Sequence, residues 1–112
     1  MSRRTHTRRR RYPRRTVRVL VEYATGAGLC CDPATTLGAG GLFVETERAL
    51  FEGARLKLRF RLPGMEHMHE IEGRVVWVRT PAESGPHAPG MGVEFTDRTA
   101  SARLARDLDA LD

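Results

Sequence analysis

The stretch that decides the fold runs from Arg55 to Leu62 and reads RLKLRFRL. Every second residue is a large apolar side chain, and every residue between them is an arginine or a lysine. Successive side chains of a β-strand point to opposite faces, whereas a helix needs an apolar period near 3.6 residues. The stretch therefore predicts a strand with one face in a hydrophobic core and the other in water.

Alternation or a short apolar run, bounded by Gly, Pro and Ser, predicts five further strands. They are expected at residues 17–23, 29–35, 42–45, 71–78 and 91–95. Trp77 falls in phase with the apolar residues of its strand, so we expect it to pack in the core. Six strands separated by turn signals favour a small antiparallel barrel or sandwich.

The apolar period changes near the C-terminus, where leucines recur at i, i+4 and i+7. This pattern predicts an amphipathic helix at about residues 98–111, with Asp97 or Thr99 as its cap. A helix of about three turns is marginal alone, so we expect it to dock on the strands. The leucines concerned are Leu104, Leu108 and Leu111.

Basic charge is concentrated at the N-terminus of the chain. Nine arginines and no acidic residue fall within the first 18 residues, whereas residues 19–112 hold ten basic and 14 acidic side chains, a balance of −4. Proteins that bind nucleic acid over a whole surface spread basic charge across a folded face. We therefore expect a flexible arginine-rich arm at residues 1–16 and a folded body at residues 17–112, with any anion bound at the arm.

The sequence also bears on the compartment. Cys30 and Cys31 are the only cysteines. Because neighbours on a strand point to opposite faces, a disulfide between them is not expected, which fits a reducing cytosol. The chain has neither a signal-peptide core nor an apolar run of membrane-spanning length. We expect a cytoplasmic protein without membrane insertion.

No set of side chains suggests catalysis or a metal site. His67 and His69 fall near a predicted turn, His87 lies in a Pro/Gly loop and His6 lies in the arm. None stands at a spacing from a carboxylate or a cysteine that would build a metal site or a catalytic triad. We interpret the first three as exposed turn histidines, and we expect no enzyme activity, no catalytic residue, no cofactor and no metal.

Three further segments of the sequence are GGLFV at residues 40–44, GRVVWV at 73–78 and GMGVEF at 90–95. Together they resemble the PilZ domain, a bacterial receptor for the second messenger cyclic di-GMP. The resemblance extends from Arg10 to the last helix and is greatest to small, stand-alone PilZ proteins of deltaproteobacteria. It implies a six-stranded antiparallel PilZ-type β-barrel with a C-terminal helix.

The first PilZ motif consists of two arginines four residues apart, just before the first strand. Arg10 and Arg14 match it, and Arg11 and Arg15 repeat the spacing one step along. The resemblance implies that these arginines fold over the ligand. A guanidinium can bind phosphate or the O6 and N7 atoms of guanine in bidentate fashion, or it can stack on the purine.

The second PilZ motif reads Asp or Asn, any residue, Ser, any two residues, Gly, and it aligns on residues 36–41. Only the last glycine matches, because Thr36 and Gly38 stand where the motif has Asp or Asn and Ser. The resemblance implies that this corner contacts the second guanine. The candidate residues here are Thr36, Gly38, Gly40 and Gly41.

The implied function is a noncatalytic cyclic di-GMP receptor that relays its signal to an unidentified motility or signalling protein. One alternative is a degenerate PilZ-like adaptor that does not bind the nucleotide and acts by protein–protein interaction. Another is a nonspecific nucleic-acid tether, since nine arginines can neutralise several phosphates. The arm has only Tyr12 as an aromatic platform, so nucleic acid is not expected to be the main partner.

Overall fold

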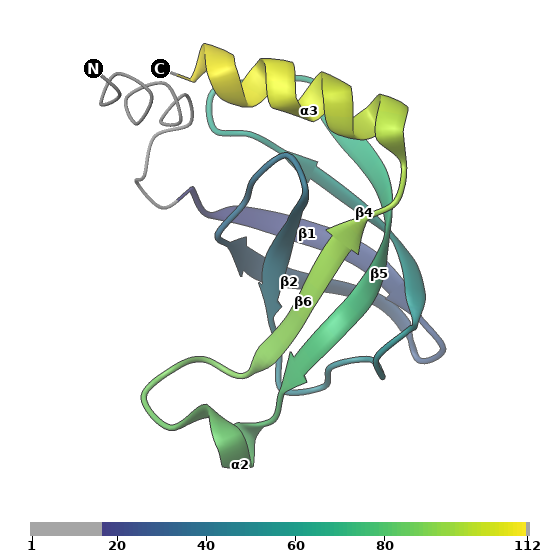
Figure 1. Ribbon diagram of the computed structural model, residues 1–112, viewed down its shortest axis with the longest axis vertical. Helices are drawn as coiled ribbons and strands as arrows, with labels where there is room; N and C mark the ends of the chain where they lie inside the picture. Colours follow the sequence, from purple (N-terminus) through teal and green to yellow (C-terminus); the bar gives the residue numbers. More distant parts are fainter. Residues whose placement is uncertain (1–16, 112) are drawn as a thin grey trace, which may run out of the picture.

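The strands of the protein close into one barrel. The computed structural model describes residues 17–111, and the strand order around the barrel is β1-β2-β3-β6-β5-β4, with antiparallel neighbours throughout (Figure 1). The predicted six-stranded antiparallel barrel with a C-terminal helix is confirmed. The elements are β1 Val19–Thr25, β2 Gly28–Thr35, β3 Gly41–Glu45, β4 Arg55–Arg61, β5 Met68–Arg79, α2 Pro81–Ser84, β6 Gly90–Phe95 and α3 Arg98–Ala110.

The barrel interior is filled by the apolar half of each alternating pattern. In β4 the apolar residues are buried and the four cations exposed, as the sequence predicts. Val21, Leu58 and Ile71 have no exposed surface at all. Full burial of such a side chain stabilises the fold by about 1.5–3 kcal/mol, so this interior dominates the free energy of folding.

Helix α3 covers one end of the barrel (Figure 1). Its buried residues are Leu104 and Leu108, two of the three leucines that predict the helix. Asp97 is the N-cap, and its side chain accepts a hydrogen bond from the Ala100 backbone N–H at 3.0 Å. The docking expected for so short a helix is therefore present.

A single helical turn, α2, lies between β5 and β6, in the Pro/Gly loop that contains His87. Thr80 and Glu83 form a capping box there, in which each side chain binds the backbone N–H of the other residue. This reciprocal pairing stabilises one turn without any buried apolar residue. Within residues 17–111, no helix combines the length and hydropathy needed to cross a bilayer.

Trp77 does not pack in the core. Val75 pairs with Val93 and Trp77 pairs with Gly92, so β5 advances two residues while β6 advances one. The extra residue forms a bulge that shifts the alternation and turns Trp77 to the outer face, where it is 42% exposed. The sequence-based expectation is wrong because it extends a regular period across this bulge.

His69 is also misplaced by the sequence pattern, since it is buried and not an exposed turn residue. Its ring is 2% exposed and stacks on Phe60, while its Nε2 atom lies 3.0 Å from Asp107 Oδ2 on α3 but off the hydrogen-bonding direction. Burial, and then the neighbouring His67, lowers the pKa of His69 below the ordinary 6.5, against the opposing effect of Asp107. His67 and His87 are exposed, as expected.

The free energy of unfolding should therefore fall on acidification. The pKa of His69 is lower in the folded than in the unfolded protein, so below pH 6.5 the unfolded chain takes up a proton that the folded chain does not. The contribution of neutral, buried His69 to the free energy of unfolding is fully present above pH 6.5. It decreases as the pH falls below that value, and it is lost entirely below the pKa of His69 in the folded protein. Denaturant unfolding at a series of pH values between neutrality and the titration range of the carboxylates measures the slope.

In the same experiment His69→Leu should flatten the slope, because it removes the titrating group while keeping an apolar side chain against Phe60. The matched control is His87→Leu, which alters an exposed loop residue and should leave the slope unchanged. An unaltered slope in His69→Leu would show that other groups cause the pH dependence.

Candidate functional site

The glycine corner, residues 36–41, joins β2 to β3. Within it the Gly38 backbone N–H donates to the Gly41 carbonyl at 3.0 Å, which closes a tight turn. The Phe95 backbone N–H donates to the Gly40 carbonyl at 2.9 Å, which fixes the turn to the end of β6. The four corner residues predicted as ligand contacts are thus held together in one short, anchored loop.

The glycines of the corner have different structural roles. A Cβ atom on Gly41 would lie 2.2 Å from the Val93 carbonyl oxygen, so this glycine allows β3 to approach β6. Added Cβ atoms on Gly38 and Gly40 would meet nothing within 4 Å. The close packing of strands explains Gly41, whereas Gly38 and Gly40 leave open space beside the loop.

Thr36 has a strained backbone at the first position of the corner. Its φ of +51° lies in the left-handed region, where β-branched residues are outliers and Asn or Asp are several-fold enriched. Its hydroxyl donates a hydrogen bond to the Thr35 carbonyl at 2.6 Å. An Asn or Asp, the residue that the second PilZ motif has here, would suit this backbone better.

The start of β1 lies beside the corner. Val19 pairs with Ala34, so the chain enters β1 next to Thr35, one residue before the corner begins. The Arg18 Nη2 atom lies 3.4 Å from Glu45 Oε1 on β3, across the outer face. The four arginines predicted as ligand contacts lie outside the described residues 17–111. They are Arg10, Arg11, Arg14 and Arg15.

An aromatic platform, made of Phe43, Trp77 and Arg79, lies on the outer face of β3 and β5. The two rings are stacked with centroids 5.1 Å apart, and the Arg79 guanidinium carbon lies 5.1 Å from the Phe43 centroid and 5.2 Å from that of Trp77. Gly90 and Gly92 on the intervening β6 leave room for the rings, since a Cβ on Gly92 would lie 2.1 Å from Trp77 Nε1. The platform offers a stacking surface beside a cation.

The corner and the aromatic platform share one outer face of the barrel. Phe43 follows Gly41 by two residues on β3, and Trp77 is aligned with Phe43 through Gly92. Two strand spacings across and two residues along give about 12 Å between the Cα positions of Gly41 and Trp77.

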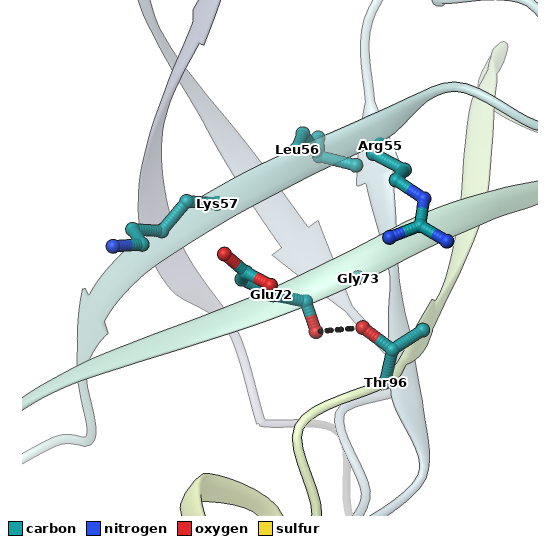
Figure 2. A pocket seen from close by; sticks show the side chains of 6 residues that line it. All are labelled: Arg55, Leu56, Lys57, Glu72, Gly73 and Thr96. Atoms are coloured by element: carbon teal, nitrogen blue, oxygen red, sulfur yellow. Dashed lines mark hydrogen bonds between the residues drawn. The ribbon is translucent and has the colours of Figure 1, made fainter.

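A hollow of about 250 Å³ lies apart from the corner, on the outer face of β4 and β5 (Figure 2). Arg55 and Lys57 project from β4 beside Glu72, and the Thr96 hydroxyl donates to the Glu72 carbonyl at 3.2 Å. Its charges are mixed and it has no aromatic wall, so it suits a purine less well than the face with the corner. Within residues 17–111, no three metal-ligating side chains gather at one place.

Sequence reasoning located the corner but missed the platform. The signal for the platform was present in the paired glycines of the GMGVEF segment, because a glycine facing outward on a strand often accommodates an aromatic ring from a neighbour. The bulge that turns Trp77 outward leaves no comparable trace in the apolar pattern.

The barrel, its terminal helix and its anchored glycine corner place the protein in the class of small six-stranded β-barrel domains. The model of the PilZ domain family matches residues 8–110, nearly the whole chain. The protein therefore belongs to the PilZ family, whose members are cyclic di-GMP-binding or adaptor domains and are not known as enzymes. Among curated proteins, no sequence matches the chain closely enough to add a second comparison.

Replacing Gly41 should destabilise the barrel, whereas replacing Gly38 should not. Gly41→Ala forces β3 away from the Val93 carbonyl and should cost about 1–3 kcal/mol of unfolding free energy. Gly38→Ala, the matched control, enters open space and should stay within about 0.5 kcal/mol of the parent. Urea unfolding measures both, and equal effects of the two variants would contradict the assigned roles.

Thr36→Asn should stabilise the protein in the absence of any ligand. Asn accepts the left-handed backbone, so relief of strain should raise the unfolding free energy by about 1 kcal/mol. Thr36→Val keeps the branched Cβ and serves as the comparison, with no gain expected. A thermal melt in which the Thr36→Asn variant is no more stable than the parent would argue against strain at this position.

Proposed function

We propose that this PilZ domain is a noncatalytic receptor for cyclic di-GMP. The N-terminal arginines Arg10 and Arg14 fold over the nucleotide, Arg11 and Arg15 assist, and the corner of Thr36, Gly38, Gly40 and Gly41 contacts it from the barrel. The observation that carries the proposal is the pairing of Val19 with Ala34, which sets the chain entering β1 beside this corner.

The length of the N-terminal segment is compatible with this arrangement. Extended chain spans at most about 3.5 Å per residue, so Arg14 lies within about 14 Å of Arg18 and Arg10 within about 28 Å. Both ranges exceed the single strand spacing of about 5 Å that separates the chain entering β1 from β2 at Thr35, the residue before the corner. The family match begins at residue 8, so it includes all four of these arginines.

The ligand fits the chemistry of the face. Cyclic di-GMP has two phosphates and two guanines, and guanidinium groups bind phosphate and the O6 and N7 edge of guanine. The exposed ring of Trp77 can stack on a purine, as aromatic side chains do with bases. Binding that orders the arginine-rich segment would change the surface that a partner meets, which is how an order transition becomes a switch.

The corner departs from the motif in a way that weakens binding. The Thr36 hydroxyl already donates to the Thr35 carbonyl, so it can only accept from the guanine N1 and N2 donors, and Gly38 has no side chain. Loss of two polar contacts costs roughly 1–4 kcal/mol, which is about five-fold to nearly a thousand-fold in affinity. The additional arginines Arg11 and Arg15 offset part of that loss.

This departure favours a second candidate function, a PilZ-like adaptor that has lost the nucleotide and acts through protein contacts. In both versions the partner is an unidentified motility or signalling protein. The proposal includes a cytoplasmic location and a function that needs no cofactor or metal. It also divides the chain into an N-terminal arm at residues 1–16, outside the described residues, and a barrel with helix at residues 17–112.

Calorimetric titration with cyclic di-GMP tests the proposal. The parent should give saturable heat, and Arg10→Ala with Arg14→Ala should lose most of it because the bidentate contacts are gone. Thr36→Asn with Gly38→Ser should tighten binding by about five-fold or more, since each restores a polar contact. The matched control, Arg48→Ala with Arg106→Ala, removes two exposed arginines from other places and should bind like the parent.

The outcomes separate the two functions. No heat from the parent, but saturable heat from the variant with Asn and Ser, would identify a chain that has lost binding and would support the adaptor. If neither the parent nor this variant gives heat, the proposal that the protein binds cyclic di-GMP is contradicted.

Trp77 should contribute to binding by stacking on a base. Trp77→Leu should lose about 1–3 kcal/mol of binding free energy. Phe51→Leu, which replaces an exposed aromatic residue in the loop between β3 and β4, should lose none. Trp77 is the only tryptophan, so its emission in the parent should change as nucleotide is added. Saturable binding without any change in this emission would place the ligand elsewhere.

A further inference from the structure

The outer face of the β1–β2 hairpin is apolar and uncovered in the described part of the chain. Leu20 is 66% exposed and Leu29 is 74% exposed. Ala24 and Cys31 between them also face outward and are exposed. Only Glu22 adds a charge on β1, and it lies 3.5 Å from Arg59. Two neighbouring strands thus present a largely apolar outer surface to water.

A row of cations borders this apolar face. All four outward residues of β4 are basic and exposed. The antiparallel pairing of Glu22 with Arg59 sets Arg61 beside Leu20 and Lys57 beside Ala24. Lys57 forms no ion pair among residues 17–111 and extends freely from β4 (Figure 2). The row consists of Arg55, Lys57, Arg59 and Arg61.

An open groove of about 440 Å³ lies between the apolar face and the cations. It forms where β1 and β4 separate on either side of their single backbone pairing. Leu20, Pro63 and Met68 give it apolar walls, and Arg18 and Arg61 stand at its edge. Apolar surface and anion-binding groups therefore meet along one line.

We propose that the β1–β2–β4 face docks on an anionic lipid bilayer. Leu20 and Leu29 enter the boundary between head groups and acyl chains. Arg55, Lys57 and Arg61 contact lipid phosphates, whereas Arg59 is paired with Glu22 and Glu70. Residues 1–16, which precede β1 in the sequence, add eight arginines, and polybasic charge near a bilayer strengthens attraction to anionic lipids. Burial of apolar side chains and attraction between a polybasic segment and anionic lipids each contribute to membrane affinity, and together they give stable peripheral binding.

Charge favours a bilayer over a second copy of this chain. A two-fold pairing of the face with itself would bring two arginine-rich segments together, because each is joined to β1 at the edge of the interface. Like charges at that density repel. An anionic bilayer instead attracts both the cations of β4 and the arginine-rich N-terminal sequence, and it also accepts exposed apolar side chains.

Vesicle sedimentation of the full chain tests this proposal, without nucleotide, so its result is independent of cyclic di-GMP binding. The probes are vesicles of equal parts phosphatidylglycerol and phosphatidylcholine, and vesicles of phosphatidylcholine alone. The parent should bind the anionic vesicles and should not bind the neutral ones. It should dissociate from the anionic vesicles as the salt concentration is raised. Leu20→Gln with Leu29→Gln should lower the partition coefficient at least about ten-fold, since two apolar insertions are lost.

Phe51→Gln is the matched control, because Phe51 is 75% exposed but lies on the β3–β4 loop and should not affect binding. Both leucines are mainly exposed, so their replacement should leave the melting temperature near that of the parent. If the parent does not bind anionic vesicles, the proposal is overturned, and a protein partner is then favoured for this face. Binding that is unchanged in the leucine variant would also overturn it, because the arginines alone would then suffice.

Discussion

The register between β1 and β2 is the constraint on which the proposed site depends. Val19 pairs with Ala34, and a slip of one residue would turn the buried Val21 and Tyr23 outward. The hydrophobic core therefore fixes where the chain enters the barrel, and it enters beside the glycine corner. A site assembled from the N-terminal arginines and this corner thus requires no adjustment of the fold.

The outer face with the corner contains two kinds of position. At some, the packing of the barrel requires glycine, whereas at others a side chain could be changed without affecting that packing. Gly41 is needed for the approach of β3 to β6, and Gly92 makes room for Trp77. Gly38 has no such requirement, and Thr36 is strained where Asn or Asp would be relaxed. These two are the positions at which the PilZ motif is not matched, so the departure affects ligand chemistry and local strain more than the barrel itself.

The strands of the barrel could be predicted from the sequence, because alternation such as that of Arg55–Leu62 indicates a strand with one buried and one exposed face. The prediction is wrong at Trp77, since a single inserted residue reverses the facing of a strand without changing its composition. The exposed position expected for His69 is wrong because β5 begins earlier than predicted, at Met68, so His69 lies on the inward face in phase with Ile71 and stacks on Phe60. For the site, the corner was found from a motif, the aromatic platform was missed, and Arg10 and Arg14 remain predictions outside residues 17–111.

The central claim is that the N-terminal arginines close over the glycine corner when cyclic di-GMP binds. Paramagnetic relaxation measures this directly, with a nitroxide on Tyr12→Cys in a chain whose Cys30 and Cys31 are replaced by Ala. The account predicts that added nucleotide broadens the amide resonances of residues 36–41 while those of the β1–β2 turn are unaffected. Saturating nucleotide that leaves the corner resonances sharp, or broadens a distant part of the barrel instead, would contradict it.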